Sequence, residues 1–226
     1  MHQHRRLWKE VRRLDDLLKR LFDLVFSLIG VLLLSPMFVL AAILIKLDSP
    51  GPVLYRGTRV GRGGKPFKML KFRTMVADAE KLGALATPEG DPRVTRVGRF
   101  LRKYKLDELP QLFNVLKGEM SLVGPRPEAA LYFEYYTPEE RSVILSVRPG
   151  ITDYGSLYYH DEGKLLTGTD DPVRAYVERV REHKVKLQMK YIQERSLLLD
   201  MKIILRTIMT ILQTRLQQEE EQRDGV

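Results

Sequence analysis

Two adjacent carboxylates, Asp107 and Glu108, stand directly before a segment that has the features of a helix start, since Pro110 lies in its first turn. Free N–H groups and the helix dipole favour ionised carboxylates, and also bound phosphate, at such an end. Aspartate can form a covalent bond to a phosphoryl group, and Mg²⁺ binds one or two carboxylates together with phosphate oxygens. The pair therefore predicts phosphoryl-transfer chemistry, and a capping and salt-bridge cluster is the alternative.

Several cations near this pair could bind phosphate groups. Lys71 and Arg73 would share one face of a strand, because side chains alternate along a strand, although an exposed strand face gives the same pattern. Arg102 belongs to a basic cluster just before the acidic pair. Arg126 stands between two prolines, which favour an extended backbone, and a rigidly held arginine suits bidentate phosphate recognition. A structural turn with an arginine–glutamate bridge is the alternative for Arg126.

An uncharged apolar stretch, residues 24–45, is long enough to enter a membrane. As a straight helix it would be about 33 Å long, against about 30 Å for the hydrocarbon core. No small-residue cleavage site follows, so we expect the stretch to be retained and not removed as a signal peptide. Pro36 cannot donate a hydrogen bond to the Leu32 carbonyl and should bend the helix. The Ser35 hydroxyl could bond to a freed carbonyl.

The basic residues that flank this stretch bear on its topology. Residues 1–20 contain seven Lys and Arg, and residues 46–65 contain five, so both flanks favour the cytoplasmic side. A spanning helix satisfies one flank only, whereas a re-entrant helix that breaks at Ser35 and Pro36 satisfies both. The residues alone leave both topologies open, and the charge count favours the re-entrant one.

The composition narrows the class of function. The chain has 226 residues, no Cys and a net charge of +9. The length suits one domain, or one domain with an appendage. The net charge suits an anionic partner, and the lack of Cys excludes disulfides and Cys-based metal sites. A phosphate loop at Gly64-Lys65 fails because Pro66 replaces the required Ser or Thr. The His residues lack the spacing of a zinc hydrolase, and no aromatic-basic motif supports binding of nucleic acid.

Charge and turn signals predict an α+β, mostly helical fold. Residues 53–106 carry 14 Lys and Arg but 4 Asp and Glu, which suits anionic lipid headgroups or a phosphorylated substrate. A β-hairpin with a Gly-rich turn is expected within residues 53–74. Residues 196–212 should form an amphipathic interfacial helix, followed by a disordered tail from Gln217. Other helices are expected at 76–82, 97–105, 110–117, 138–147 and 171–187, and loops at 83–92 and 121–128.

These expectations divide the chain into three regions. Residues 1–47 form a basic N-terminal helix and the re-entrant membrane segment. Residues 48–212 form a cytoplasmic, membrane-associated catalytic domain that contains the hairpin. Residues 213–226 form a polar tail.

Six motifs, which follow one another over about residues 20–212, together resemble the bacterial sugar transferases, that is, the monotopic phosphoglycosyl transferases. The resemblance implies the minimal form of the family, without the extra multi-span region of larger members. The motifs are Ser35-Pro36, Asp48 to Val53 (DSPGPV), Lys71 to Met75 (KFRTM), Leu106 to Gln111 (LDELPQ), Asn114 to Glu128 (NVLKGEMSLVGPRPE) and Pro149 to Thr152 (PGIT).

The resemblance implies transfer of a sugar 1-phosphate from a UDP-sugar to a polyprenyl (undecaprenyl) phosphate. This would be the first membrane step of surface glycan assembly, at the cytoplasmic face of the bacterial inner membrane. Asp107 would attack the sugar-linked phosphate and UMP would leave, after which the lipid phosphate would attack the phosphosugar-aspartate. Mg²⁺ would be held by Asp107 and Glu108, and the membrane helix would be re-entrant, with its break at Ser35-Pro36. Substrate phosphates would be bound by Lys71, Arg73, Arg102 and Arg126. Whether the protein forms a homodimer stays open.

The chain departs from the family pattern in two places. Tyr104-Lys105 stands where many members have small hydroxyl residues, and Asp153-Tyr154 stands where many have Gly and then an aromatic residue. The identity of the sugar therefore stays open. Two other functions also stay open: a non-catalytic scaffold on anionic membranes, and a glycosyl transferase that releases UDP in place of UMP.

Overall fold

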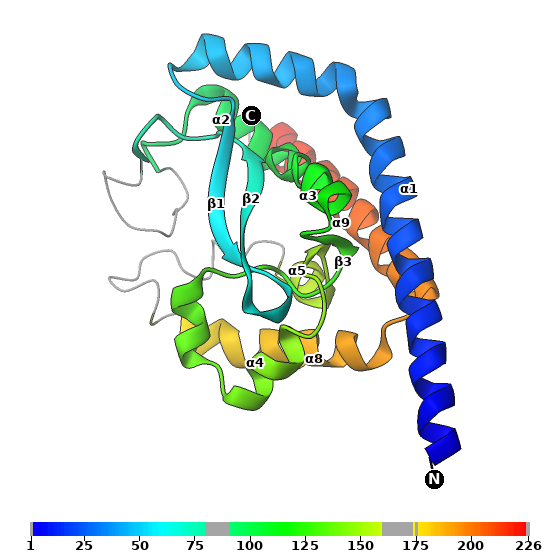
Figure 1. Cartoon of the computed structure of the whole chain (residues 1–226). Helices are drawn as coiled ribbons and strands as arrows, with labels where there is room; N and C mark the ends of the chain where they lie inside the picture. The colour runs from blue at the N-terminus through cyan, green and yellow to red at the C-terminus, as the bar shows by residue number, and fades with distance from the viewer. Residues whose placement is uncertain (1, 80–90, 160–173, 175, 225–226) are drawn as a thin grey trace.

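The structure, a computed structural model, describes residues 2–79, 91–159, 174 and 176–224, with only the backbone described in residues 2–13 and 214–224. Its elements confirm the predicted α+β, mostly helical class (Figure 1). The helices are α1 (His2–Asp48), α2 (Arg96–Lys103), α3 (Gln111–Lys117), α4 (Pro138–Ile144), α5 (Tyr154–Tyr158), α8 (Glu182–Glu194) and α9 (Leu197–Asp224). The strands are β1 (Leu54–Val60), β2 (Pro66–Phe72), β3 (Ser121–Val123) and β4 (Gly150–Thr152). Short helical turns are η1 (Arg62–Gly64), η3 (Leu106–Glu108), η4 (Ala130–Tyr135) and the π-helical η5 (Val177–Arg181).

The predicted hairpin lies at the centre of the molecule, and α1 arches around it (Figure 1). Strands β1 and β2 pair antiparallel, with Leu54 opposite Phe72 and Val60 opposite Pro66. The turn between them needs glycine, because Gly63 and Gly64 have φ values of +69° and +76°. Antiparallel pairing brings the basic residues of both strands onto one small sheet.

Helix α1 confirms the predicted hydrogen bond at its proline. The Ser35 hydroxyl donates to the Leu32 carbonyl at 2.8 Å, which is the carbonyl that Pro36 cannot serve. The helix does not end at Ser35-Pro36; it continues through both residues and bends within its apolar half (Figure 1). The pair therefore produces a bend, and the expected re-entrant path stays a prediction.

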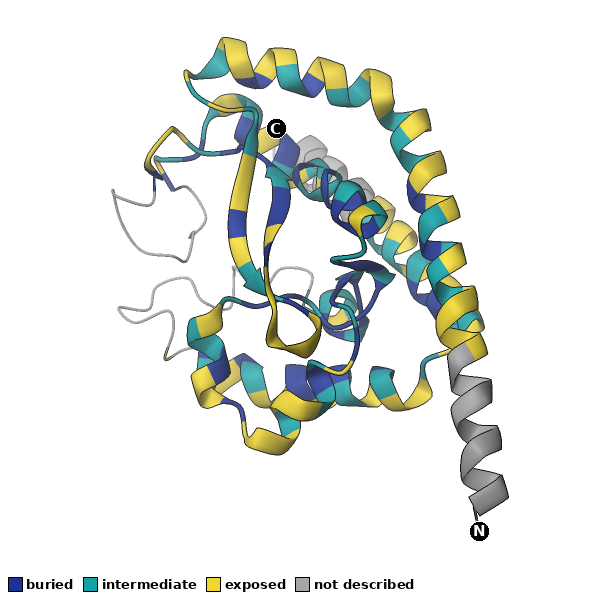
Figure 2. Cartoon of the chain, in the orientation of Figure 1, coloured by how far each residue is buried: buried dark blue, intermediate teal, exposed yellow. Residues whose placement is uncertain are grey.

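The exposure of α1 fits contact with a membrane. Its segment Leu14–Asp48 is long and apolar enough to cross a bilayer, and only 11% of its most apolar window is buried. Figure 2 shows exposed residues along the outer side of the arch. Large apolar side chains such as Leu33 and Leu47, which are 75% and 79% exposed, would be costly in water. We conclude that the protein is membrane-bound through this helix.

The end of α1 is packed onto the hairpin. Ala41 and Ile45 are buried against Phe72, and the ring of Phe38 lies 5.7 Å from the rings of both Phe72 and Phe113. Burial of these side chains fixes the membrane helix to the hairpin and to α3. The apolar segment and the basic sheet therefore form one packed unit.

Three expectations about local structure were wrong or incomplete. Residues 76–79 form a turn and the start of a 3₁₀ turn where a helix over 76–82 was expected, and residues 80–82 lie outside the described residues. Residues 121–128 contain strand β3, which pairs parallel with β4. The tail from Gln217 is not disordered, because α9 continues to Asp224; Gln and Glu are good helix formers, so the polar sequence extends the helix.

The helices expected at 97–105, 110–117 and 138–147 fall close to the observed boundaries, whereas the helix expected to end at 187 continues to Glu194. Helix α3 ends at Gly118, which has a φ of +86°. Tyr176 and Val180, which lie within the helix expected at 171–187, are buried. The loop expected at residues 83–92 and the start of the helix expected at 171–187 lie largely outside the described residues.

Candidate active site

The acidic pair lies in the short turn η3, between α2 and α3, just before α3 begins. Lys105 precedes it with a φ of +53°, a left-handed conformation that reverses the chain after α2. Such backbone strain is often found at functional sites. Asp107 is 8% exposed, and no side-chain hydrogen bond to its carboxylate comes from the described residues. Asp107 is therefore a desolvated carboxylate with its oxygens free of described donors.

Of the two carboxylates, Glu108 is the one that forms ion pairs with basic side chains. Its carboxylate accepts a hydrogen bond from Lys71 Nζ at 2.7 Å, and from the Arg126 guanidinium at 2.5 and 3.2 Å. Burial alone would raise the pKa of Glu108, but Arg126 and Lys71 together hold that pKa well below its usual value. Glu108 is thus a fixed negative charge that places two cations beside Asp107.

The environment of Asp107 acts in the opposite direction. Burial raises the pKa of Asp107, and the negative charge of Glu108 adds to this, while Lys71 and Arg102 oppose it. The two adjacent carboxylates therefore differ in proton affinity, which is the pattern seen where two acids have separate roles.

Arg102 reaches the site from α2. Its Nε donates to Thr74 Oγ1 at 2.8 Å, and its charge acts on Asp107. Helix α2 lies close to the segment after β2, because a Cβ at Gly98 would lie only 2.0 Å from the Thr74 carbonyl oxygen. Glycine at this position lets the helix bring Arg102 to the acidic pair.

Arg126 is held by a rigid loop between β3 and η4, as its two prolines predicted. Its backbone N–H donates to Asp153 Oδ2 at 3.2 Å, and the Pro125 carbonyl accepts from Gly150 N at 2.9 Å. A Cβ at Gly150 would lie 2.0 Å from Gly124 N, so glycine is required where the two segments meet. The guanidinium is thereby fixed toward Glu108.

Arg73 does not join the acidic pair. It follows the last residue of β2, and its guanidinium donates to the carbonyls of Pro50 and Ser49, the latter at 2.7 Å, and to Ile45 at 3.4 Å. These carbonyls belong to the end of α1 and the turn after it, so Arg73 caps the membrane helix. The structure brings together Lys71, Arg102, Arg126, Asp107 and Glu108, and it places Arg73 elsewhere.

Three residues of the site had no assigned role in the sequence. Asn114 of α3 accepts from Leu70 N at 2.9 Å and donates to the Lys68 carbonyl at 2.8 Å, so it covers the free edge of β2. The carboxylate of Asp153 is fully buried and caps α5 through Ser156 N at 2.6 Å. Glu128 accepts from the hydroxyls of two buried tyrosines. The sequence marked Asn114 and Glu128 as the ends of a matched motif and Asp153 as a departure from the family pattern, but it assigned none of them a contact.

The donor set suits a magnesium ion bound jointly with substrate. No cluster of three or more His, Cys, Asp or Glu side chains occurs among the described residues. Mg²⁺ commonly uses one or two carboxylates and completes its shell with water and phosphate oxygens. Asp107 offers oxygens free of described donors, whereas Glu108 is engaged by two cations. Of the two carboxylates, Asp107 would therefore be the better ligand for such an ion in the arrangement that the structure shows.

Comparison with known proteins agrees with this geometry. A profile of the family described as "Bacterial sugar transferase" matches residues 14–214. A Caulobacter vibrioides protein named UDP-glucose:undecaprenyl-phosphate glucose-1-phosphate transferase is 44% identical over 88% of this chain and 71% of its own length. A putative undecaprenyl-phosphate N-acetylgalactosaminyl 1-phosphate transferase of Bacillus subtilis is 53% identical over 54% of this chain and 68% of its own. The exopolysaccharide production protein PSS of Rhizobium leguminosarum is 40% identical over 87% of this chain and 96% of its own.

Proposed function

Because the chain belongs to the bacterial sugar transferase family, we propose that it transfers a sugar 1-phosphate from a UDP-sugar to a polyprenyl phosphate and releases UMP. The relatives' names support the general reaction, and the name of the Rhizobium relative supports a role in surface polysaccharide assembly. The observation in this chain that carries the proposal is the division between the two carboxylates. Glu108 is bound by Lys71 and Arg126, while Asp107 keeps a desolvated carboxylate beside them.

The proposed reaction has two displacements at phosphorus. An oxygen of the Asp107 carboxylate attacks the sugar-linked phosphorus of the UDP-sugar, and the bond to UMP breaks, so that UMP leaves with the bonding electrons. An oxygen of the polyprenyl phosphate then attacks the phosphosugar-aspartate. The carboxylate is released, and the product is a polyprenyl diphosphate sugar.

The cations have the exposure that substrate binding needs. The side chains of Lys71 and Arg126 are 21% and 29% exposed, so phosphate oxygens can reach them without unfolding the site. The charge of Arg102 acts on Asp107, and Arg102 would offset charge on the same phosphates. Mg²⁺, held by Asp107 and Glu108, would when bound lower the negative charge of the phosphates.

The nucleotide product and the covalent intermediate test this proposal together. Purified protein is given Mg²⁺, undecaprenyl phosphate and a panel of UDP-sugars, and the nucleotide released is measured. We expect UMP, and without the lipid acceptor we expect the mass of a phosphosugar on Asp107. The Asp107→Asn variant should lose turnover because an amide is a poor nucleophile.

Each contrary result has a clear meaning. Release of UDP would show that the protein is a glycosyl transferase that moves the sugar without its phosphate. Membrane binding without turnover would favour a non-catalytic scaffold. Near-normal turnover by Asp107→Asn would exclude this residue as the nucleophile. A Lys186→Gln variant is the control, because Lys186 is exposed and pairs only with Glu182 on its own helix among the described residues.

We further propose that both ends of the apolar segment of α1 face the cytoplasm, which would place the catalytic domain on the cytoplasmic face of the inner membrane. The bend of α1 and the basic residues on both flanks support this topology. The chain has no Cys, so Gln3→Cys and Thr58→Cys can be labelled one at a time with a membrane-impermeant thiol reagent. Both should react only after cell lysis. Labelling of Gln3→Cys alone in intact cells would show a spanning helix.

A further inference from the structure

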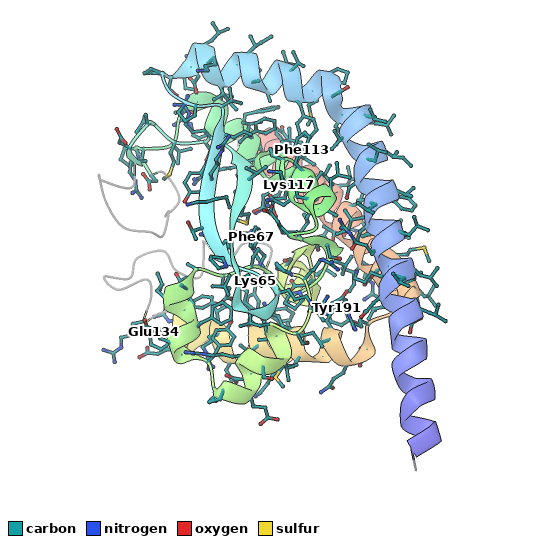
Figure 3. All side chains as sticks on the ribbon, in the orientation of Figure 1. Lys65, Phe67, Phe113, Lys117, Glu134 and Tyr191 are labelled. Carbon is teal, nitrogen blue, oxygen red and sulfur yellow. The ribbon has the colours of Figure 1, made fainter. Side chains whose placement is uncertain are left out.

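A groove of about 690 Å³ lies between the hairpin and α3, away from the acidic pair. Its volume falls within the range of about 300–1,000 Å³ that is usual for small-molecule sites. Figure 3 shows Phe113 and Lys117 on α3, with Phe67 across from them on the hairpin. The apolar lining residues used below are Leu54, Leu70 and Phe113, and the basic ones are Arg56, Lys68 and Lys117.

Most hairpin side chains of the groove lie on the face opposite to Lys71: Leu54, Arg56, Lys68 and Leu70 do, whereas Phe67 lies on the Lys71 side. In the β1–β2 register Arg56 lies opposite Leu70, so these two side chains share one face. Lys71, the next residue along β2, points to the other face, where it binds Glu108. A ligand in the groove therefore does not lie on the face where Lys71 meets the acidic pair.

The apolar end of the groove continues into the membrane helix. The ring of Phe113 lies 5.7 Å from the ring of Phe38 on α1. Leu54 packs with the same cluster as Phe38, around Ala41 and Ile45. An apolar chain that leaves the groove at this end would thus meet the apolar surface of α1 and not open water.

The other end of the groove carries an excess of positive charge. Arg56, Lys68 and Lys117 are all exposed. Lys68 donates to the Thr58 hydroxyl, and neither Arg56 nor Lys117 has an acidic partner among the described residues. The single acid of the lining, Glu119, accepts a hydrogen bond from Asn114 at 2.6 Å. The cations are therefore free to bind an anion.

We propose that this groove binds one anionic phospholipid of the surrounding membrane, with an acyl chain against Leu54, Leu70 and Phe113 and the headgroup phosphate at Arg56, Lys68 and Lys117. An apolar surface that joins a membrane helix, next to unpaired cations, matches the two ends of such a lipid. The inference is independent of the proposed reaction, because it concerns the opposite face of the hairpin.

Native mass spectrometry of the full-length protein, released from detergent micelles that contain phosphatidylglycerol or phosphatidylcholine, tests this site. We expect one phosphatidylglycerol to stay bound, in preference to phosphatidylcholine. The double variant Arg56→Gln/Lys117→Gln should bind phosphatidylglycerol roughly 30-fold more weakly, because each lost cation costs about 1 kcal/mol. The charge-matched control is Lys65→Gln/Lys186→Gln, and both of its positions are exposed and outside the proposed contacts.

Three outcomes would overturn the proposal. One is equal binding of phosphatidylglycerol by the double variant and the control. Another is equal retention of phosphatidylcholine by the unmodified protein. The third is displacement of the bound lipid by one equivalent of undecaprenyl phosphate, which would make the groove a site for the acceptor. Inorganic phosphate in millimolar excess should leave the lipid bound, because phosphate lacks the apolar contacts; loss of the lipid would also count against the proposal.

Discussion

The two faces of the β1–β2 hairpin carry similar charge in different surroundings. On one face Lys71 is bonded to Glu108, which Arg126 also binds, and all three side chains are partly buried. On the other face Arg56 and Lys117 are exposed and have no acidic partner among the described residues. The sign of the charge is the same, but only the first face holds its cations in one geometry.

The difference separates chemistry from attachment. A phosphoryl group in transit needs cations that are already in place, because reorganising them during the reaction would cost free energy. A lipid headgroup needs only an excess of positive charge and gains little from fixed geometry. Glu108 makes this difference, because it keeps Lys71 and Arg126 oriented at the expense of part of their charge.

Removal of Glu108 should have the largest effect, because it removes the difference between the two faces of the hairpin. In Glu108→Gln no carboxylate would orient Lys71 and Arg126, just as none among the described residues orients Arg56 on the other face of the hairpin. We expect turnover to fall roughly 10²- to 10³-fold and the dependence of the rate on Mg²⁺ to weaken. Steady-state rates across a magnesium titration measure both effects. Unchanged magnesium dependence would move the metal site away from Glu108.

Arg126 and Arg73 sharpen the comparison, because both are arginines in matched motifs but only Arg126 reaches Glu108. Arg126→Gln should lower kcat/KM roughly 10- to 150-fold, from about 1.5–3 kcal/mol for a hydrogen bond to a charged group. Arg73→Gln should act mainly on stability, since the end of α1 loses its cap. Thermal unfolding and kinetics on the same two preparations separate these effects. A larger loss of kcat/KM for Arg73→Gln than for Arg126→Gln would reverse our assignment.

The pH dependence gives the smallest expected effect. In the proposed mechanism Asp107 must be ionised to attack, and burial raises its pKa above the usual 3.8. The acidic limb of kcat/KM should therefore lie above that value. Lys71→Gln removes the charge that lowers the pKa of Asp107 most strongly, so it should move the limb to higher pH. Lys71→Arg keeps the charge and should leave the limb closer to its original position. A limb that moves to lower pH in Lys71→Gln would contradict this electrostatic account.

Local features of the fold could be predicted from the sequence. The Gly-rich turn predicted the hairpin, and the helix expected at 110–117 matches α3, which ends before Gly118. The hydrogen bond from Ser35 to the Leu32 carbonyl follows from the missing N–H of Pro36. Each of these depends on residues close together in the chain, where propensity and backbone geometry decide the outcome.

Contacts between distant segments could not be predicted in this way. The two strands of the parallel pair β3–β4 are three residues long and are separated by 26 residues of chain. Strands this short leave no periodic pattern in the sequence. Arg73 was expected to bind phosphate together with Lys71 because the two would share one face of a strand, but its partners are carbonyls at the end of α1. The sequence identified both carboxylates, whereas their separate environments depend on Lys71 and Arg126, which are brought together only by the fold.

The amide of Asn114 has a consequence for how this protein can diversify. It binds β2 through the N–H of Leu70 and the carbonyl of Lys68, so it contacts the main chain and is indifferent to which side chains those positions carry. Substitutions at positions 68 and 70 can therefore remodel the groove side of the hairpin while Lys71 stays aligned with Glu108. Selection could tune the fit to membranes of different lipid content separately from catalysis.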